Sequence, residues 1–225
     1  MICKSFKDKE KLRRAGRSAA TILDRLCSAI QPGMSTLEID ELGGQLMEEF
    51  RVKSACKGYR SGHRIFPSYT CLSVNDEVVH GIGVEDRILK DGDVISVDVC
   101  IREDGMIGDN CRTIPVGLVS PEVDKLLRVT EESLYEGIKK AVHKNRVGDV
   151  SQAVQQHVEK QGFAVITNFV GHGVGRSLHE DPQIPNFGKA GTGPKFKKGM
   201  AICIEPMVNM KSAQIRMASD GWTAL

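Results

Sequence analysis

Two segments of the chain repeat one pattern, and this repeat constrains the possible folds more than any other feature. Residues 89–98 read LKDGDVISVD, and residues 196–205, offset by 107 positions, read FKKGMAICIE. Each has a lysine, a glycine and an apolar stretch typical of a β-strand. A carboxylate then follows six residues after the glycine, at Asp98 and at Glu205. A chance similarity between two strand entries is the alternative explanation.

The elements around the two segments come in the same order. Helical periodicity predicts helices at residues 7–29, 36–50, 121–142 and 150–163. Each pair of helices is followed by predicted strands: residues 70–75, 77–83, 94–101 and 106–117 after the first pair, and residues 164–170 and 200–208 after the second. This order predicts one α+β domain over residues 1–225, with a central antiparallel sheet and pseudo-twofold halves at about 1–118 and 119–225.

Two acids lie in a predicted hairpin at residues 94–111, VISVDVCIREDGMIGDNC. If Asp104 and Gly105 form a two-residue turn, Asp109 lies opposite Cys100 and Asp98 is its diagonal neighbour on the same face. A three-residue turn would place the two acids on opposite faces. Carboxylates sharing a buried face repel unless they share a proton or bind a metal ion. A hairpin whose acids lie in water is the alternative.

Other polar residues interrupt apolar stretches in the same way. Glu205 lies between Ile204 and Pro206, and His80 ends the predicted strand at 77–83. The segment GHGVGRSLHEDP contains His172 and His179, and the glycines beside His172 allow a close approach of the backbone. Isolated histidines at strand ends are usually ordinary polar residues. Three histidines with three strand carboxylates favour a hydrolytic site for Mn, Fe, Co or Zn, with one or two ions.

Composition excludes several classes of protein. The net charge of +2 indicates no strong attraction to nucleic acid or to a membrane. No apolar stretch approaches the roughly 20 residues of a membrane span, and the N-terminus lacks the apolar core of a secretion signal. The basic run KSFKDKEKLRR fits a solvated helix face, with an RNA contact as the alternative. Seven scattered cysteines without a CxxC pair predict reduced thiols and a cytoplasmic location.

Longer motifs along essentially the whole chain resemble the type I methionine aminopeptidases of the pita-bread fold. The motifs are SVNDEVVHGI, DVISVDVCIREDGMIGDNC, GHGVGRSLHEDPQIPNFG and IEPMV. The resemblance implies a monomeric metallopeptidase that removes the initiator methionine of nascent chains when the second residue is small, with possible ribosome association. The ions implied are one or two divalent metals, among Co, Mn, Fe, Zn and Ni.

The resemblance also implies a role for each site residue. It implies that Asp98 and Asp109 bind metal, that His172 and Glu205 complete the ligands, and that Glu205 also shuttles a proton. It places His80 near the scissile bond and His179 on the substrate. The implied pocket for the methionine side chain is lined by five residues, whose sulfur atoms and aromatic edges suit a thioether: Cys56, Tyr59, Phe66, Cys71 and Trp222. Ordinary core packing is the alternative reading of these five.

The chain departs from the family pattern in three places. Leu178 replaces an aromatic residue before His179, and residues 60–65, with His63, form a short insertion expected at the surface. A second glutamate ligand is expected in a strand after DGWTA, and no residue before Leu225 matches it. If the chain ends there, we expect at most one tightly bound metal ion and weak or no activity. The competing functions are a non-catalytic module that binds nascent chains, ribosomes or RNA, and an Xaa-Pro peptidase.

Overall fold

The computed structural model describes residues 2–3 and 5–225, so Met1 and Lys4 of the predicted domain lie outside the described residues. The chain forms two compact units. We call Glu10–Ser120 with Arg216–Leu225 the N-terminal unit, and Met1–Lys9 with Pro121–Ile215 the C-terminal unit. The main division falls between Ser120 and Pro121, and each terminal segment belongs to the unit built mainly from the other half of the chain. Within the described part, no helix is both long and apolar enough to cross a membrane.

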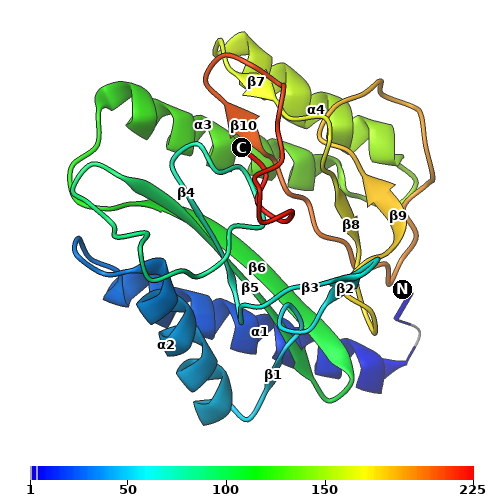
Figure 1. Ribbon diagram of the computed structural model, residues 1–225. Helices are drawn as coiled ribbons and strands as arrows, with labels where there is room; N and C mark the ends of the chain where they lie inside the picture. Colours follow the sequence, from blue (N-terminus) through cyan, green and yellow to red (C-terminus); the bar gives the residue numbers. More distant parts are fainter. Residues whose placement is uncertain (1, 4) are drawn as a thin grey trace. The chain divides into compact units, whose positions relative to one another are not determined.

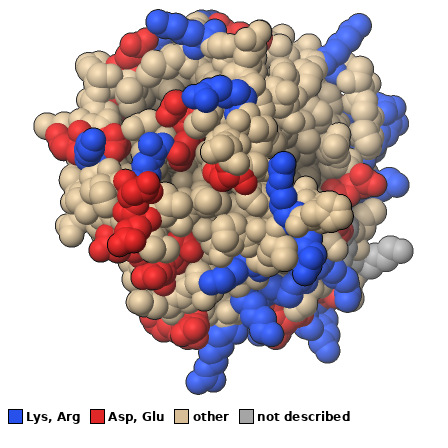
Figure 2. All heavy atoms as spheres, viewed as in Figure 1, with Lys and Arg blue, Asp and Glu red and all other residues tan. Residues whose placement is uncertain are grey.

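Two amphipathic helices, α1 (Phe6–Ala29) and α2 (Thr36–Glu49), begin the chain (Figure 1). The buried face of α1 carries residues at helical spacing: Ala15, Ala19, Ile22, Leu23 and Leu26. In the described part of the basic run, Lys7, Lys9, Arg13 and Arg14 are exposed, as predicted, and Arg13 pairs with Glu10 at 2.6 Å. Figure 2 shows acidic and basic side chains together on the viewed face, in keeping with the small net charge.

A capping box starts α2. The Ser35 hydroxyl accepts a hydrogen bond from the Glu38 amide at 3.1 Å, and the Glu38 carboxylate accepts one from the Ser35 amide at 2.7 Å. We expect Ser35→Ala to lower the free energy of unfolding by about 1 kcal/mol, because loss of the hydroxyl leaves the Glu38 amide without its acceptor. Urea unfolding measures this, with Ser28→Ala on the exposed face of α1 as the control. Equal stability of the two variants would contradict the capping role.

The central strand of the N-terminal unit is β5 (Val94–Glu103), in a four-stranded antiparallel sheet. Its partners are β1 (Lys53–Ser54), β4 (Cys71–Val74) and β6 (Met106–Pro115). One face of β5 is fully buried by four alternate residues: Ile95, Val97, Val99 and Ile101. Asp98 lies on the other face, so it does not displace a residue of this core.

The hairpin turn between β5 and β6 has the predicted two residues. Asp104 and Gly105 both have positive φ, 47° and 78°, as a tight hairpin turn requires. The register therefore pairs Cys100 with Asp109 and places Asp98 diagonally on the same face, which confirms the prediction. The expected insertion forms a separate exposed hairpin, β2 (Arg60–Ser61) with β3 (Arg64–Ile65).

The C-terminal unit begins with the predicted helix pair, α3 (Pro121–Lys140) and α4 (Val147–Lys160). Its strands are short: β7 (Ala164–Val165), β8 (Gly171–Gly173), β9 (Glu180–Ile184) and β10 (Val208–Asn209). They form two-stranded pairs, β10 with β7 and β8 with β9 (Figure 1). Among the described residues, one core cluster forms around Val150, Val154 and Ile184, and another forms around Val129, Val158 and Phe163.

Three predicted strands were too long. Only Ala164–Val165 of the predicted strand at 164–170 is a strand, and residues 77–83 contain a single bridge, Val79 with Ala224. The predicted strand at 200–208 is mostly replaced by isolated hydrogen bonds to other segments, such as the one that the Cys203 amide donates to the His172 carbonyl at 2.7 Å. Pro206 has no amide to donate, and a regular ladder does not continue through it.

The sequence repeat corresponds to a repeated turn. The amide of Asp93 donates to the Lys90 carbonyl at 3.1 Å, and the amide of Met200 donates to the Lys197 carbonyl at 3.1 Å. Gly92 and Gly199, 107 positions apart, both have positive φ, 92° and 87°. The two turns therefore share their closing hydrogen bond and the positive φ of their glycine.

Candidate metal centre and substrate site

The N-terminal unit holds one group of potential metal ligands. One ligand atom each from Asp98, Cys100 and Asp109 lies within 4.8 Å of the other two. Both carboxylates are half-buried and the thiol is buried, donating a hydrogen bond to Asp98 at 3.4 Å. Two carboxylates this close repel in a partly desolvated setting, and a divalent cation removes the repulsion. The donors present therefore fit a metal ion.

Two further buried thiols adjoin this group. Cys71 is the direct cross-strand partner of Asp98. Cys56 lies just after β1, and the residue before it, Ala55, donates its amide to the Cys100 carbonyl at 2.8 Å. Hydrogen bonds from the thiols of Cys100 and Cys71 lower the pKa of Cys56. The same bonds with Cys56, together with burial, raise the pKa of the other two. Of the three thiols, Cys56 therefore loses its proton most readily.

The C-terminal unit holds a second ligand group. His172 is buried, and its Nε2 lies 3.2 Å from a carboxylate oxygen of half-buried Glu205. Its Nδ1 lies 2.9 Å from the Gly173 carbonyl, which can only accept, so Nδ1 carries the proton. In the neutral imidazole the Nε2 lone pair then faces a carboxylate, an arrangement that a bound cation stabilises. His179 is exposed, with its ring centre 4.4 Å from that of His172.

The glycines beside His172 have the predicted steric role. A Cβ atom at Gly171 would lie 2.4 Å from the Cys203 carbonyl oxygen, and one at Gly173 would lie 2.3 Å from the Asp181 carbonyl oxygen. Both contacts are with backbone, which cannot rotate away. Only glycine lets the neighbouring chains approach His172 this closely.

We expect Gly173→Ala to destabilise the protein by about 2 kcal/mol or more, because β8 must move away from β9. Gly16→Ala is the matched control, since a Cβ atom there meets nothing within 4 Å and alanine favours the interior of α1 by about 0.5–1 kcal/mol. Thermal and urea unfolding of both variants measure the difference. A Gly173→Ala protein as stable as wild type would contradict the close packing.

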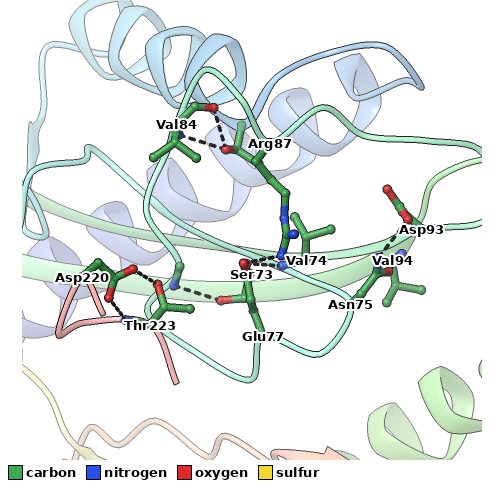
Figure 3. A network of polar contacts seen from close by, with 12 residues as sticks. Ser73, Val74, Asn75, Glu77, Val84, Arg87, Asp93, Val94, Asp220 and Thr223 are labelled. Atoms are coloured by element: carbon green, nitrogen blue, oxygen red, sulfur yellow. Dashed lines mark hydrogen bonds and ion pairs between the residues drawn. The ribbon is translucent and has the colours of Figure 1, made fainter. Parts of the chain in front are cut away.

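His80 is held by the last residues of the chain. The amide of Ala224 donates to the Val79 carbonyl at 3.0 Å, and the amide of Val78 donates to the Ala224 carbonyl at 2.7 Å. Figure 3 shows Asp220 facing Thr223, whose hydroxyl donates to it at 2.6 Å. The chain turns at residues 218–221, where the Gly221 amide donates to the Ala218 carbonyl at 3.1 Å.

The conformation and charge of His80 are both unusual. Its φ is 61°, a left-handed conformation that histidine adopts more readily than most residues. Burial lowers the pKa of its imidazole, and the neighbouring Cys56 opposes this less strongly. The ring is therefore neutral near pH 7.

The predicted pocket residues form two contacts. Cys56 and Cys71 are hydrogen-bonded to each other, and the Phe66 and Trp222 rings meet edge to face with centres 5.3 Å apart. Tyr59, the fifth, is 37% exposed, although its carbonyl accepts from the Phe66 amide at 2.8 Å.

Cys100 and Cys203 were not predicted as potential ligands. Their alternation with Asp98 and Glu205 was a signal in the sequence, because residues two apart on an extended strand share a face.

Comparison with known proteins assigns the class. The sequence pattern described as metallopeptidase family M24 matches residues 10–223. A methionine aminopeptidase crystal structure from Thermotoga maritima has a TM-score of 0.94 and 42% identity, covering 100% of this chain and 89% of that one. A prolidase from Pyrococcus horikoshii, at 20% identity and a TM-score of 0.76, covers 91% of this chain and 55% of that one and shares the fold alone. The fold is the pita-bread fold.

The particular relatives are more specific. A methionine aminopeptidase from Clostridium perfringens is 43% identical over 225 residues, covering 100% of this chain and 88% of the relative. The chain therefore belongs to metallopeptidase family M24, among the methionine aminopeptidases.

Proposed function

We propose that this protein removes the N-terminal methionine of nascent chains whose second residue is small, in a reaction that depends on a divalent metal. The observation that carries the proposal is the register that brings Asp98 and Asp109 onto one face of β5 and β6, in a chain of a metallopeptidase family. A divalent cation supplies Lewis-acid activation of water and of the substrate carbonyl.

In the N-terminal unit the proposed metal ligands are Asp98 and Asp109. In the C-terminal unit they are His172 and Glu205. Glu205 takes the proton of the attacking water and delivers it to the leaving amine. The contact between His172 Nδ1 and the Gly173 carbonyl supports His172 as a ligand, because it leaves the lone pair of Nε2 available to a metal ion. Among Co, Mn, Fe, Zn and Ni, availability in the cell decides which ion is used.

The remaining predicted residues bind the substrate. His80 and His179 donate hydrogen bonds to the oxygen of the scissile carbonyl and stabilise the charge that develops there. Cys56, Cys71, Phe66 and Trp222 contact the methionine thioether, since polarisable sulfur and aromatic edges suit it, and Tyr59 closes the entrance.

The test is release of free methionine from a Met-Ala-Ser peptide with added Mn²⁺ or Co²⁺. We expect release with metal, none with EDTA, and little from Met-Leu-Ser. Metal-independent release would overturn the metal mechanism, and cleavage of Ala-Pro in place of Met-Ala-Ser would indicate a prolidase activity.

We also propose that the protein is a cytoplasmic monomer that works on chains leaving the ribosome. The seven free cysteines support the cytoplasmic location, because a reducing compartment keeps thiols free. The exposed basic residues of α1 support the association with ribosomes. Light scattering should give the mass of one chain, 24.7 kDa. A larger mass would contradict the monomer, and absence from sedimented ribosomes would contradict the association.

A further inference from the structure

Each ligand group contains a cysteine to which the proposed reaction gives no role. In the N-terminal unit, Cys100 lies directly opposite Asp109 and two residues from Asp98. In the C-terminal unit, Gly173 pairs with Ile202, so the next residue, Cys203, lies opposite His172 and two residues from Glu205. The same arrangement thus occurs in each unit: a thiol lies opposite one ligand and two residues along its own strand segment from another.

The distances are those of potential ligands. The sulfur of Cys100 lies within 4.8 Å of a carboxylate oxygen from both Asp98 and Asp109. The sulfur of Cys203 lies within 4.8 Å of a ring nitrogen of His172 and an oxygen of Glu205. Cys100 is 4% exposed and Cys203 is half-buried, so water competes little for either sulfur.

Thiolate changes which ions such a centre prefers. Carboxylates and water suit Mg²⁺ and Mn²⁺, whereas thiolate selects thiophilic ions. We propose that Cys100 is a thiolate ligand of a metal ion bound by Asp98 and Asp109, and that Cys203 is a thiolate ligand of a metal ion bound by His172 and Glu205. Each ligand group therefore prefers Zn²⁺, Co²⁺ or Cd²⁺ to Mn²⁺ and Mg²⁺. The inference rests on the proposed function, because it requires a metal held by the neighbouring ligands.

The binding step is a ligand exchange without oxidation. The S–H bond breaks, the proton passes to solvent, and a sulfur–metal bond replaces a bond between the metal and water. A divalent ion makes this exchange favourable, since coordinated thiols are deprotonated.

The experiment is titration of the metal-free full chain with Co²⁺, followed by absorption. Thiolate coordination gives a near-ultraviolet charge-transfer band, whereas oxygen and nitrogen ligands alone give only the visible ligand-field bands. We expect both kinds of band in wild type and a weaker charge-transfer band in Cys100→Ser and in Cys203→Ser. Cys27→Ser, a half-buried thiol of α1, is the control and should keep the full spectrum.

The outcomes separate this inference from the proposed function. Visible bands without a charge-transfer band in wild type would overturn thiolate ligation and leave the metalloenzyme intact, whereas no bands at all would overturn both. A full charge-transfer band in either variant would overturn the assignment of that cysteine.

Competition between Cd²⁺ and Mn²⁺ for wild type needs no variant. We expect a preference for Cd²⁺ of more than about tenfold, and equal affinities would overturn the inference.

Discussion

Replacing Asp109 with asparagine is expected to lower kcat/KM by about a thousandfold or more, which corresponds to about 4 kcal/mol of transition-state stabilisation. Asparagine keeps the size of the side chain but removes the charge that binds the cation. Methionine release from Met-Ala-Ser under saturating Co²⁺ measures the loss. Asp104→Asn, in the exposed turn of the same hairpin, is the matched control, because asparagine accepts the positive φ of 47°.

The same substitution should stabilise the metal-free protein. The oxygens of Asp98 and Asp109 lie within 4.8 Å of each other, so removing one charge relieves repulsion of about 1 kcal/mol at this partly exposed position. In EDTA we expect Asp109→Asn to unfold at higher urea than wild type, and added Co²⁺ to raise the melting temperature of wild type alone. A variant less stable than wild type in EDTA, with full activity in Co²⁺, would show that the acids serve only the fold.

Replacing His80 with asparagine is expected to lower kcat by about a hundredfold or more, with a smaller effect on KM, because an imidazole at the scissile bond acts mainly in the transition state. Asparagine tolerates the left-handed conformation at φ 61°, so the backbone held by Ala224 should persist. His63→Asn, on the exposed hairpin, should retain activity. Equal activity of the two variants would remove His80 from the site.

The lowered pKa of His80 adds a pH-dependent signature. Below about pH 6.5 His80 of the unfolded chain takes up a proton, whereas burial keeps the folded chain from doing so. Protonation of His80 therefore lowers the free energy of unfolding as the pH falls and has no effect on it well above pH 6.5. Urea unfolding of wild type and His80→Asn at two pH values isolates it. We expect wild type to lose more stability on acidification than the variant, and equal losses would contradict the burial effect.

The sequence alone determined much of the fold. The spacing of apolar residues located the helices, because burial of one face follows a 3.6-residue period whatever the helix packs against. The dipeptide Asp104-Gly105 predicted a two-residue turn, and with it the register that pairs Asp109 with Cys100. The segments of the 107-residue repeat, which precede Asp98 and Glu205, both contain a turn closed by the same hydrogen bond.

Other features depended on contacts between residues far apart in the chain. The short pairing around Cys203 and the position of the His80 loop against Ala224 are set by backbone hydrogen bonds between distant segments, on which local propensity carries no information. The proximity of the Cys100 and Cys203 sulfurs to neighbouring ligands also needed the fold, because it depends on strand pairing as well as alternation. Residue types and spacing therefore determined the elements and the chemistry available, whereas tertiary pairing decided which donors share a site.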